Sequence, residues 1–315
     1  MSINDLKNQI LELKRKSDVT ILAHYYQNIE IQEIADYLGD SLGLCRIAKE
    51  KANTEFIIFA GVDFMVETAS IINPNKRILI PNPESCCPMA SYLTAKDVKQ
   101  FKRKYPNMPV IVYVNSSAEV KAEADICCTS SNSIKIAKRM QNEFDSDGVL
   151  FGPDANLAGY VEDNSKVKTI KMPEVGHCVV HTRLKSADIK VLKDKHPSAK
   201  ILVHPECERE VRQLADIVGS TAQMYSYIRD SPSHINQFII GTEKGLLERM
   251  RADYPDNKYY LANENMICYN MKKHNLEFIK YLLENPDNEN FEIKVPKDIA
   301  ERALTPIKRM LEYSQ

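Results

Sequence analysis

Three cysteines stand at nearly equal intervals along the 315-residue chain. Cys87, Cys178 and Cys268 are separated by 91 and 90 residues, and each closes a segment of similar sequence. A trigonal set of thiolates can hold three irons of a [4Fe–4S] cluster and leave the fourth iron open, or hold one zinc ion with water in the fourth place. His177 and His181 flank Cys178, so a mixed zinc site is a third alternative. The symmetry, and the absence of a C-x₂-C pair from the sequence, favour the cluster.

The remaining five cysteines do not occupy this symmetric position. We expect them to be buried free thiols, because cysteine is among the most buried residue types. They are Cys45, Cys86, Cys127, Cys128 and Cys207.

Polar side chains that can bind and transfer protons repeat with the same period. One position in the repeat is occupied by His24, Tyr113 and His204, and the position two residues later by Tyr26, Asn115 and Glu206. All six follow a short apolar run, which indicates one shared site. Glu206 could act as a general base, His24 and His204 as proton carriers, and Tyr26 as an acid.

A third repeated position carries a hydroxyl group. Ser41, Ser130 and Thr221 occupy it, directly after Asp40, Thr129 and Ser220. Such residues are commonly helix N-caps. A helix N-terminus also binds phosphate or carboxylate groups, so the set favours an anionic substrate.

These residues lie on a threefold repeat of about 90 residues. Ala-Asp pairs begin at 35, 124 and 215, and Gly-x-Asp/Glu sites begin at 61, 152 and 241. Short apolar runs alternate with helical stretches in each copy, which is typical of βαβ units with a parallel sheet. Ligands bind beyond the carboxyl ends of such strands, and every landmark follows an apolar run. We therefore predict an α/β protein with three similar small αβα domains, each with a parallel sheet, arranged about a pseudo-threefold axis.

The predicted domains comprise residues 1–92 plus 290–315, 93–182 and 183–289. Residues 3–16 should form a helix capped by Ser2. Residues 291–295 should form a strand, followed by a helix that opens after Pro296, and both ends of the chain should complete the first domain.

Composition excludes several classes of protein. The net charge is −1 and no basic field stands out, so nucleic acid is not an expected partner. No apolar run approaches the ~20 residues of a membrane span, and the first residues lack the apolar core of a signal peptide. We expect a cytoplasmic protein. The G-x-G-x-x-G, P-loop, H-E-x-x-H and G-x-S-x-G motifs are absent from the sequence, which argues against nucleotide dependence and serine hydrolysis.

From end to end the chain resembles the quinolinate synthase family. The matching segments are AHYYQ (23–27), GDSL (39–42), GVDFM (61–65), CPMA (87–90), YVNS (113–116), GHCVVH (176–181), HPEC (204–207) and GSTAQM (219–224). The resemblance implies condensation of iminoaspartate with dihydroxyacetone phosphate to quinolinate, with loss of phosphate and two waters, in NAD biosynthesis. It also implies three α/β domains and one [4Fe–4S] cluster, whose open iron binds substrate as a Lewis acid.

The resemblance also implies roles for individual residues. The cluster ligands would be Cys87, Cys178 and Cys268. His24, Tyr26, His204 and Glu206 would be the acid–base and substrate-orienting set, Tyr113 and Asn115 would contact the substrate backbone, Ser41, Ser130, Ser220 and Thr221 would bind phosphate or carboxylate groups, and Met65 would line the pocket. Cys86 beside the first ligand, and Val179 where the family usually has proline, depart from the common pattern.

Two other functions fit part of the pattern. A hydro-lyase could use the same open-iron cluster on a hydroxy acid, but it would not need hydroxyl groups for a phosphorylated substrate. A cluster carrier would need an exposed cluster, whereas the repeats place this one centrally. The expected partners are therefore the two small substrates, together with a transient contact to the enzyme that supplies iminoaspartate.

Overall fold

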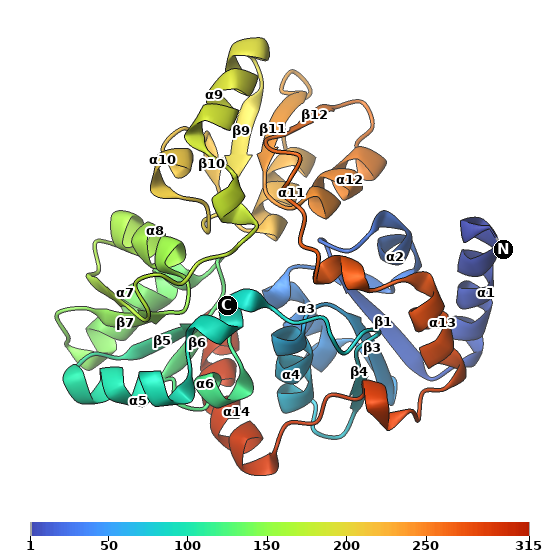
Figure 1. Ribbon diagram of the computed structural model, residues 1–315, viewed down its shortest axis with the longest axis horizontal. Helices are drawn as coiled ribbons and strands as arrows, with labels where there is room; N and C mark the ends of the chain where they lie inside the picture. Colours follow the sequence, from blue (N-terminus) through green and yellow to red (C-terminus); the bar gives the residue numbers. More distant parts are fainter. Residues whose placement is uncertain (1, 315) are drawn as a thin grey trace.

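The computed structural model describes residues 2–314, which form three parallel four-stranded sheets arranged around a common centre (Figure 1). Each sheet and its helices are called a unit here, numbered in chain order. The strand order is the same in every unit: the first and third strands lie in the middle, with the second and fourth outside them. The predicted fold class, α/β with three similar αβα units, is confirmed.

The strands are short and occupy equivalent places in the three units. The first sheet contains β1 (Val19–His24), β2 (Tyr37–Gly39), β3 (Phe56–Ala60) and β4 (Arg77–Leu79). The second contains β5 (Val110–Tyr113), β6 (Ile126–Cys128), β7 (Val149–Gly152) and β8 (Thr169–Lys171). The third contains β9 (Lys200–Val203), β10 (Ile217–Val218), β11 (Gln237–Gly241) and β12 (Lys258–Leu261). The strands β1, β3, β5 and β7 are buried along their whole length, which explains their continuous apolar sequences.

The helices also follow the repeat. Unit one contains α2 (Ile29–Ile34), α3 (Ser41–Glu50), α4 (Asp63–Ile72) and the 3₁₀ turn η1 (Pro88–Tyr92). Unit two contains α6 (Ala118–Lys121), α7 (Ser133–Phe144), α8 (Ala155–Ser165) and η2 (His181–Arg183). Unit three contains α10 (Arg209–Arg212), α11 (Thr221–Arg229), α12 (Lys244–Asp253) and η3 (Met271–Lys273).

The helix that follows each cysteine packs on the next sheet. Val98 of α5 (Ala95–Lys104) packs against the second sheet, and Ile189 of α9 (Ser186–Lys195) packs against the third. Ile279 of α13 (Leu276–Glu284) packs against β1 of the first sheet, beside α1 (Ile3–Lys16). These three helices therefore close the units into a ring (Figure 1).

The Ala-Asp landmark turns out to be structural. In each unit the aspartate carboxylate accepts a hydrogen bond from an N–H of the unit's first strand, and the aspartate N–H donates to the carbonyl of the same strand residue. The pairs are Asp36 with Ile21, Asp125 with Val110 and Asp216 with Ile201, with carboxylate distances of 2.8, 2.7 and 2.9 Å. The repeated aspartates thus anchor the chain that leads to the second strand.

Both ends of the chain contain the predicted helices. Helix α1 covers Ile3–Lys16, and Ser2 caps it by accepting a hydrogen bond from the backbone N–H of Asp5. The predicted strand at 291–295 is wrong: the segment follows the 3₁₀ turn η4 (Glu289–Phe291) and makes one isolated bridge, between Glu292 and Leu79. Phe291 belongs to the 3₁₀ turn, so the pairing consists of only two bonds, from Ile80 N to Phe291 O and from Ile293 N to Ile78 O.

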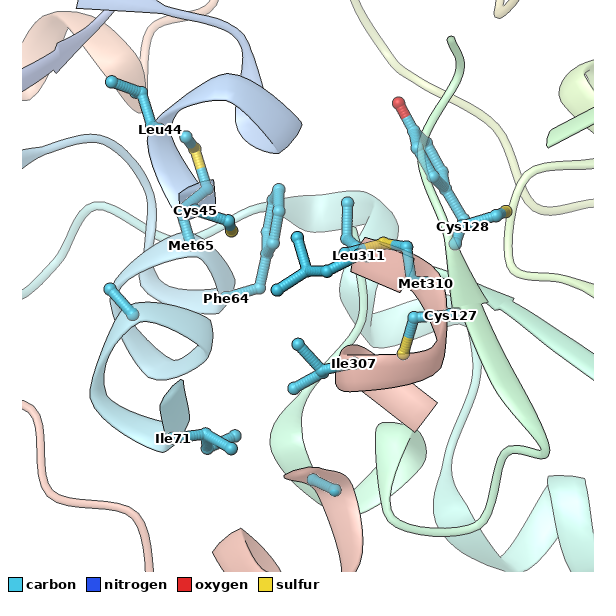
Figure 2. Close-up of a cluster of buried hydrophobic side chains, with 14 of the residues drawn as sticks. Leu44, Cys45, Phe64, Met65, Ile71, Cys127, Cys128, Ile307, Met310 and Leu311 are labelled. Atoms are coloured by element: carbon cyan, nitrogen blue, oxygen red, sulfur yellow. The ribbon is translucent and has the colours of Figure 1, made fainter. Parts of the chain in front are cut away.

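Helix α14 (Lys297–Tyr313) joins two units by packing against α4 on one side and β6 and α6 on the other. Figure 2 shows Ile307, Met310 and Leu311 of α14 beside Phe64 and Cys127. The proposed domain limits, which assign this helix to the first domain, stay a prediction.

Four of the five additional cysteines are buried, as predicted: Cys45, Cys127, Cys128 and Cys207. Cys86 is exposed instead, because the loop turns Cys87 rather than its neighbour inward. Among residues 2–314 no helix is long and apolar enough to cross a membrane.

Candidate functional site

A cavity lies where the three units meet, at the carboxyl ends of their central strands. About 700 Å³ of space, including its open side, lies between its walls. Every predicted site residue except Ser220 lines it: His24, Tyr26, Ser41, Met65, Cys87, Tyr113, Asn115, Ser130, Cys178, His204, Glu206, Thr221 and Cys268. The repeat therefore predicted which side chains converge. What each of them does stays a prediction.

The three symmetric cysteines face this cavity as potential metal ligands. Burial raises the pKa of the Cys87 and Cys178 thiols well above the usual range, and raises that of Cys268 to about 11. Hydrogen bonds from backbone N–H groups two and three residues after each cysteine act in the opposite direction. Each sulfur thus has two donors of a kind that stabilise a metal-bound thiolate.

The spacing of the sulfurs exceeds what one zinc ion requires. Three thiolates at ~2.3 Å from a tetrahedral zinc lie about 3.8 Å from one another. Within residues 2–314, the Sγ atoms of Cys87, Cys178 and Cys268 do not form a group in which all lie within 4.8 Å of one another. The donor set fits a larger group that offers each thiolate its own metal atom.

One tighter group of potential ligands exists in the described chain: Cys178, His181 and Glu206, with ligand atoms within 4.8 Å of one another. Nε2 of His181 lies 2.9 Å from Thr242 Oγ1, whereas Nδ1 lies 2.7 Å from Glu206 Oε2 as an ion-pair contact without the alignment of a hydrogen bond. His177 is exposed, with its Nδ1 2.9 Å from the carbonyl of Val175. This geometry disfavours the mixed zinc site.

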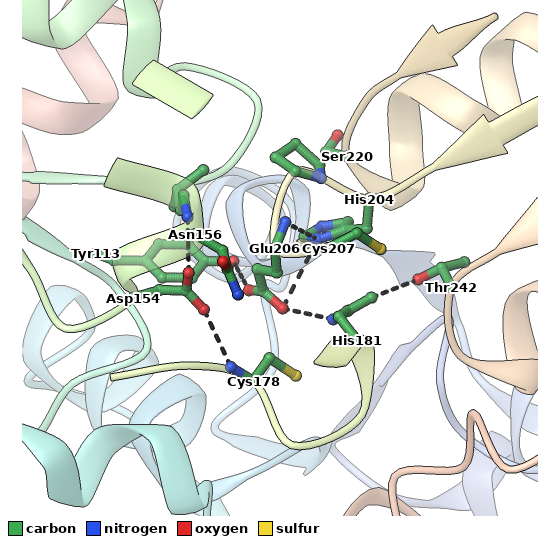
Figure 3. Close-up of polar contacts among 12 residues, drawn as sticks. Tyr113, Asp154, Asn156, Cys178, His181, His204, Glu206, Cys207, Ser220 and Thr242 are labelled. Atoms are coloured by element: carbon green, nitrogen blue, oxygen red, sulfur yellow. Dashed lines mark hydrogen bonds and ion pairs between the residues drawn. The ribbon is translucent and has the colours of Figure 1, made fainter. Parts of the chain in front are cut away.

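Glu206 is the centre of a polar network in the cavity wall (Figure 3). The Tyr113 hydroxyl donates to Oε1 at 2.6 Å, His181 Nδ1 lies 2.7 Å from Oε2, and His204 Nδ1 lies 3.7 Å from Oε2. Burial alone would raise the pKa of Glu206, but the neighbouring histidines and the bond from Tyr113 outweigh it and lower the pKa. Glu206 is therefore a buried carboxylate with a hydrogen bond to Oε1 and histidine nitrogens near Oε2.

The two buried histidines at the strand ends, His24 and His204, differ from Glu206 in that burial decides their ionisation. Burial lowers the pKa of His24 and of His204 to about 3. Glu206 opposes this in both cases, and Lys272 adds to it for His24. Both imidazoles are consequently neutral at neutral pH. Nδ1 of His24 accepts from the backbone N–H of Tyr26 at 3.1 Å and Nδ1 of His204 accepts from that of Glu206 at 3.3 Å, so each ring offers its Nε2–H to a ligand.

A chain of polar contacts connects Glu206 to Tyr26. His181 links Glu206 to the Thr242 hydroxyl, and Thr242 Oγ1 lies 2.6 Å from the hydroxyl oxygen of Tyr26. Burial raises the pKa of Tyr26 well above its usual value, and Glu206 contributes in the same direction. Tyr26 is thus a neutral phenol that can exchange a proton through Thr242 and His181.

The hydroxyl positions divide into two groups. Ser41 and Thr221 are the first residues of α3 and α11, Ser130 lies shortly before α7, and all three face the cavity. Ser220 instead caps α11 by accepting from Gln223 N, and its hydroxyl lies 3.3 Å from Asp40 Oδ2. It lines the neighbouring hollow, and its contact with substrate stays a prediction.

Asn115 carries the clearest sign of a missing ligand. Its Oδ1 is buried and has no hydrogen-bond partner among the described residues. It lines the cavity beside Tyr113. An unpaired buried oxygen costs free energy unless something binds it, which fits a polar group of a substrate. Met65 adds an apolar wall from α4.

Comparisons with known proteins show the family of this chain. The family model described as Quinolinate synthetase A protein matches residues 8–312. The chain belongs to the quinolinate synthetase A family. Curated proteins named quinolinate synthase include one from Methanothermobacter thermautotrophicus, 45% identical over 99% of this chain and 100% of the relative. A second is from Pyrococcus abyssi, 44% identical over 98% of this chain and 100% of the relative. A third is from Thermotoga maritima, 43% identical over 97% of this chain and 98% of the relative.

Two residues of this quinolinate synthetase A site carry contacts that sequence reasoning did not assign. From the sequence His181 stands out only as a neighbour of Cys178, and no pattern points to Thr242. Thr242 lies between Gly241 and Glu243 of a repeated landmark, but Val62 and Pro153 occupy its place in the other repeats. Symmetry therefore could not single it out.

Proposed function

We propose that this protein is a quinolinate synthase, which condenses iminoaspartate with dihydroxyacetone phosphate and releases phosphate and two waters. The observation that carries the proposal is one cavity that combines three widely spaced thiols with the Glu206–His181–Thr242–Tyr26 chain. Family membership supports the same activity.

The proposed cofactor is one [4Fe–4S] cluster on Cys87, Cys178 and Cys268. When bound, it would supply a Lewis-acidic iron with an open position, without net redox change in the turnover. Two N–H donors lie near each sulfur, and the three sulfurs form no group within 4.8 Å of one another among residues 2–314; both observations support this cofactor over a single zinc ion.

The substrate ends would be held by neutral donors. Both substrates are anionic, and Ser41 and Thr221 stand at the N-termini of α3 and α11, where hydroxyl and N–H groups bind phosphate or carboxylate. Asn115 and Tyr113 would orient the carbon backbone from the second unit, and Met65 would pack against it.

The proton transfers follow from the network. Carbon–carbon bond formation requires loss of a proton beside the imine, and Glu206 is the carboxylate placed to accept it. The dehydrations require a proton for each departing hydroxyl group, and Tyr26 can donate one and recover it through Thr242 and His181. His24 and His204 can hold the carbonyl oxygens as neutral donors. The buried walls would keep water away from the hydrolytically fragile imine.

The test is a defined assay with anaerobically prepared protein. Iminoaspartate generated in place, together with dihydroxyacetone phosphate, should give quinolinate and one phosphate per quinolinate, detected by chromatography and mass. Omission of either substrate should abolish the product. Dehydration of a simple hydroxy acid without quinolinate formation would instead support the hydro-lyase, which the family match does not favour.

Two further proposals concern the compartment in which the protein works and the enzyme that it meets there. The protein would work in the cytoplasm, where thiols stay reduced. It would meet the enzyme that supplies iminoaspartate only transiently, because the unstable imine benefits from a short path.

A further inference from the structure

A carboxylate holds each of the three cavity-facing cysteines through its backbone N–H. These carboxylates are the acidic residues of the repeated Gly-x-Asp/Glu landmark, to which no role has been assigned above. The bonds run from Cys87 N to Asp63 Oδ1 at 3.2 Å, from Cys178 N to Asp154 Oδ2 at 3.1 Å (Figure 3), and from Cys268 N to Glu243 Oε1 at 3.2 Å.

A second bond fixes each loop on the other side of the cysteine. In every unit a helix begins at the carboxylate residue or at the residue after it. The first N–H of that helix donates to the backbone carbonyl of the residue two positions before the cysteine. The pairs are Asp63 N to Ser85 O at 2.9 Å, Ala155 N to Gly176 O at 2.8 Å, and Lys244 N to Met266 O at 3.0 Å. Each cysteine is thus tied at two points to a helix N-terminus.

The carboxylates are themselves held by their helices, and here the units differ. Asp154 accepts from Leu157 N with Oδ1 and from Cys178 N with Oδ2. Glu243 likewise uses separate oxygens, Oε2 for Gly245 N and Oε1 for Cys268 N. Both side chains are fully buried.

Asp63 uses a single oxygen for both of its bonds. Oδ1 accepts from Phe64 N at 2.8 Å and from Cys87 N at 3.2 Å. An asparagine at position 63 could therefore keep both bonds with its one carbonyl oxygen. At position 154 or 243 an amide would have to turn its NH₂ group toward one N–H donor and lose a bond.

We propose that Asp63, Asp154 and Glu243 are positioning residues that hold Cys87, Cys178 and Cys268 at the spacing and orientation the metal group requires. The inference rests on the cluster proposed above. The carboxylate accepts the hydrogen bond from the N–H of the cysteine itself. The hydrogen bonds to the sulfur come from the N–H groups of the residues two and three positions later. Removal of an outer partner of a metal ligand typically costs 10–100-fold in metal affinity.

The experiment compares five variants with the wild type, all purified anaerobically: Asp154→Asn, Glu243→Gln, Asp63→Asn, Asp63→Ala and Asp97→Asn. Asp97 completes the capping box of α5 with Thr94 and contacts no cysteine, so it controls for loss of a helix-cap carboxylate. Iron and sulfide content is measured first. The rate of iron transfer to a strong chelator is then followed by the loss of visible absorption. Thermal unfolding is recorded alongside.

We expect iron release about tenfold faster or more in Asp154→Asn, Glu243→Gln and Asp63→Ala. Asp63→Asn and Asp97→Asn should match the wild type. The retained cluster in Asp63→Asn but not in Asp63→Ala is a rescue that a general loss of stability would not produce.

Equal release rates in the wild type, Asp154→Asn and Glu243→Gln would overturn the inference while leaving the cluster in place. If Asp154→Asn fails to fold, the Asp63 pair decides: fast release in both variants, or in neither, overturns it. A wild-type protein that holds no iron and sulfide would overturn the proposed function, and this inference with it.

Discussion

Tyr26 and Thr242 stand 216 residues apart in the chain, yet their hydroxyl oxygens lie 2.6 Å apart in the cavity wall. Tyr26 follows β1 of the first unit and Thr242 follows β11 of the third. The contact therefore exists only when the ring of units is closed, and it joins Tyr26 of the first unit to the polar network around Glu206.

Thr242→Val should lower kcat of quinolinate synthesis by about 10²-fold, the lower end of what general acid–base groups contribute. The methyl group keeps the volume but removes the oxygen that links Tyr26 to His181. KM should change far less, since Thr242 does not line the cavity. Steady-state kinetics of anaerobic protein with equal iron content gives the measurement.

Thr242→Ser is the matched control and should retain most of the activity, because its hydroxyl can make both bonds. Wild-type kcat in Thr242→Val would show that protons reach Tyr26 by another path.

Arg212 should contribute strongly to stability at the contact between the second and third units. Its NH1 donates to the carbonyls of Asn156, Pro205 and Cys207 at 3.0, 3.3 and 2.6 Å. Arg212→Ala would leave these buried acceptors without their donor, and we expect a loss of ~3 kcal/mol in the free energy of unfolding. Urea denaturation of metal-free protein measures it.

Arg209 offers a matched control because it pairs with the same carboxylate, Asp163, that Arg212 approaches. Its side chain is 68% exposed, so Arg209→Ala should cost less than ~1 kcal/mol. Equal effects of the two substitutions would mean that the buried carbonyl contacts of Arg212 do not stabilise the fold.

Asp216 should make stability depend on pH in the acid range. Partial burial opposes ionisation, but bonds from Ile201 N and Lys200 outweigh it and lower the pKa of the carboxyl group. A lowered pKa in the folded state gives stabilisation that is complete above the unfolded pKa of ~3.9 and is lost as the pH falls through the folded value. Asp216→Ala should therefore be less stable than the wild type at neutral pH, by ~1.5 kcal/mol.

The difference between the two proteins should shrink as the pH falls below ~4. Urea midpoints at several pH values test this, with the exposed Asp147 as a control whose substitution by alanine should leave the midpoint unchanged. A difference that stays constant down to the lowest pH would show that the carboxylate charge plays no part.

The repeat in the sequence was enough to predict the fold class, and every predicted site residue except Ser220 lines the cavity. Parallel strands align their carboxyl ends, so equivalent positions in three copies had to meet. His24, Tyr113 and His204 are the clearest case, since each is buried at the end of its unit's first strand.

Symmetry fails where the units differ in their contacts. Ser220 and Thr221 are neighbours at the start of α11, but the Ser220 side chain is used by Gln223 and Asp40 and turns from the cavity. Residue type and spacing do not reveal which of two adjacent hydroxyls serves as the cap.

Contacts between distant segments were also beyond reach from the sequence. Glu292 has a β-rich neighbourhood, but the preceding residue, Phe291, belongs to a 3₁₀ turn and the pairing is limited to one bridge. Asp63, Asp154 and Glu243 were recognised as landmarks, whereas the loop that brings each of them to a cysteine depends on the tertiary fold.

The most direct test of the account is metal and sulfide analysis of anaerobically purified wild type, Cys87→Ala, Cys178→Ala, Cys268→Ala and the exposed neighbour variant Cys86→Ala. We predict about four irons and four sulfides per chain in the wild type and in Cys86→Ala, and loss of the cluster in each of the other three. Zinc without sulfide, or a cluster that survives the loss of Cys87, Cys178 or Cys268, would contradict the three-thiolate site.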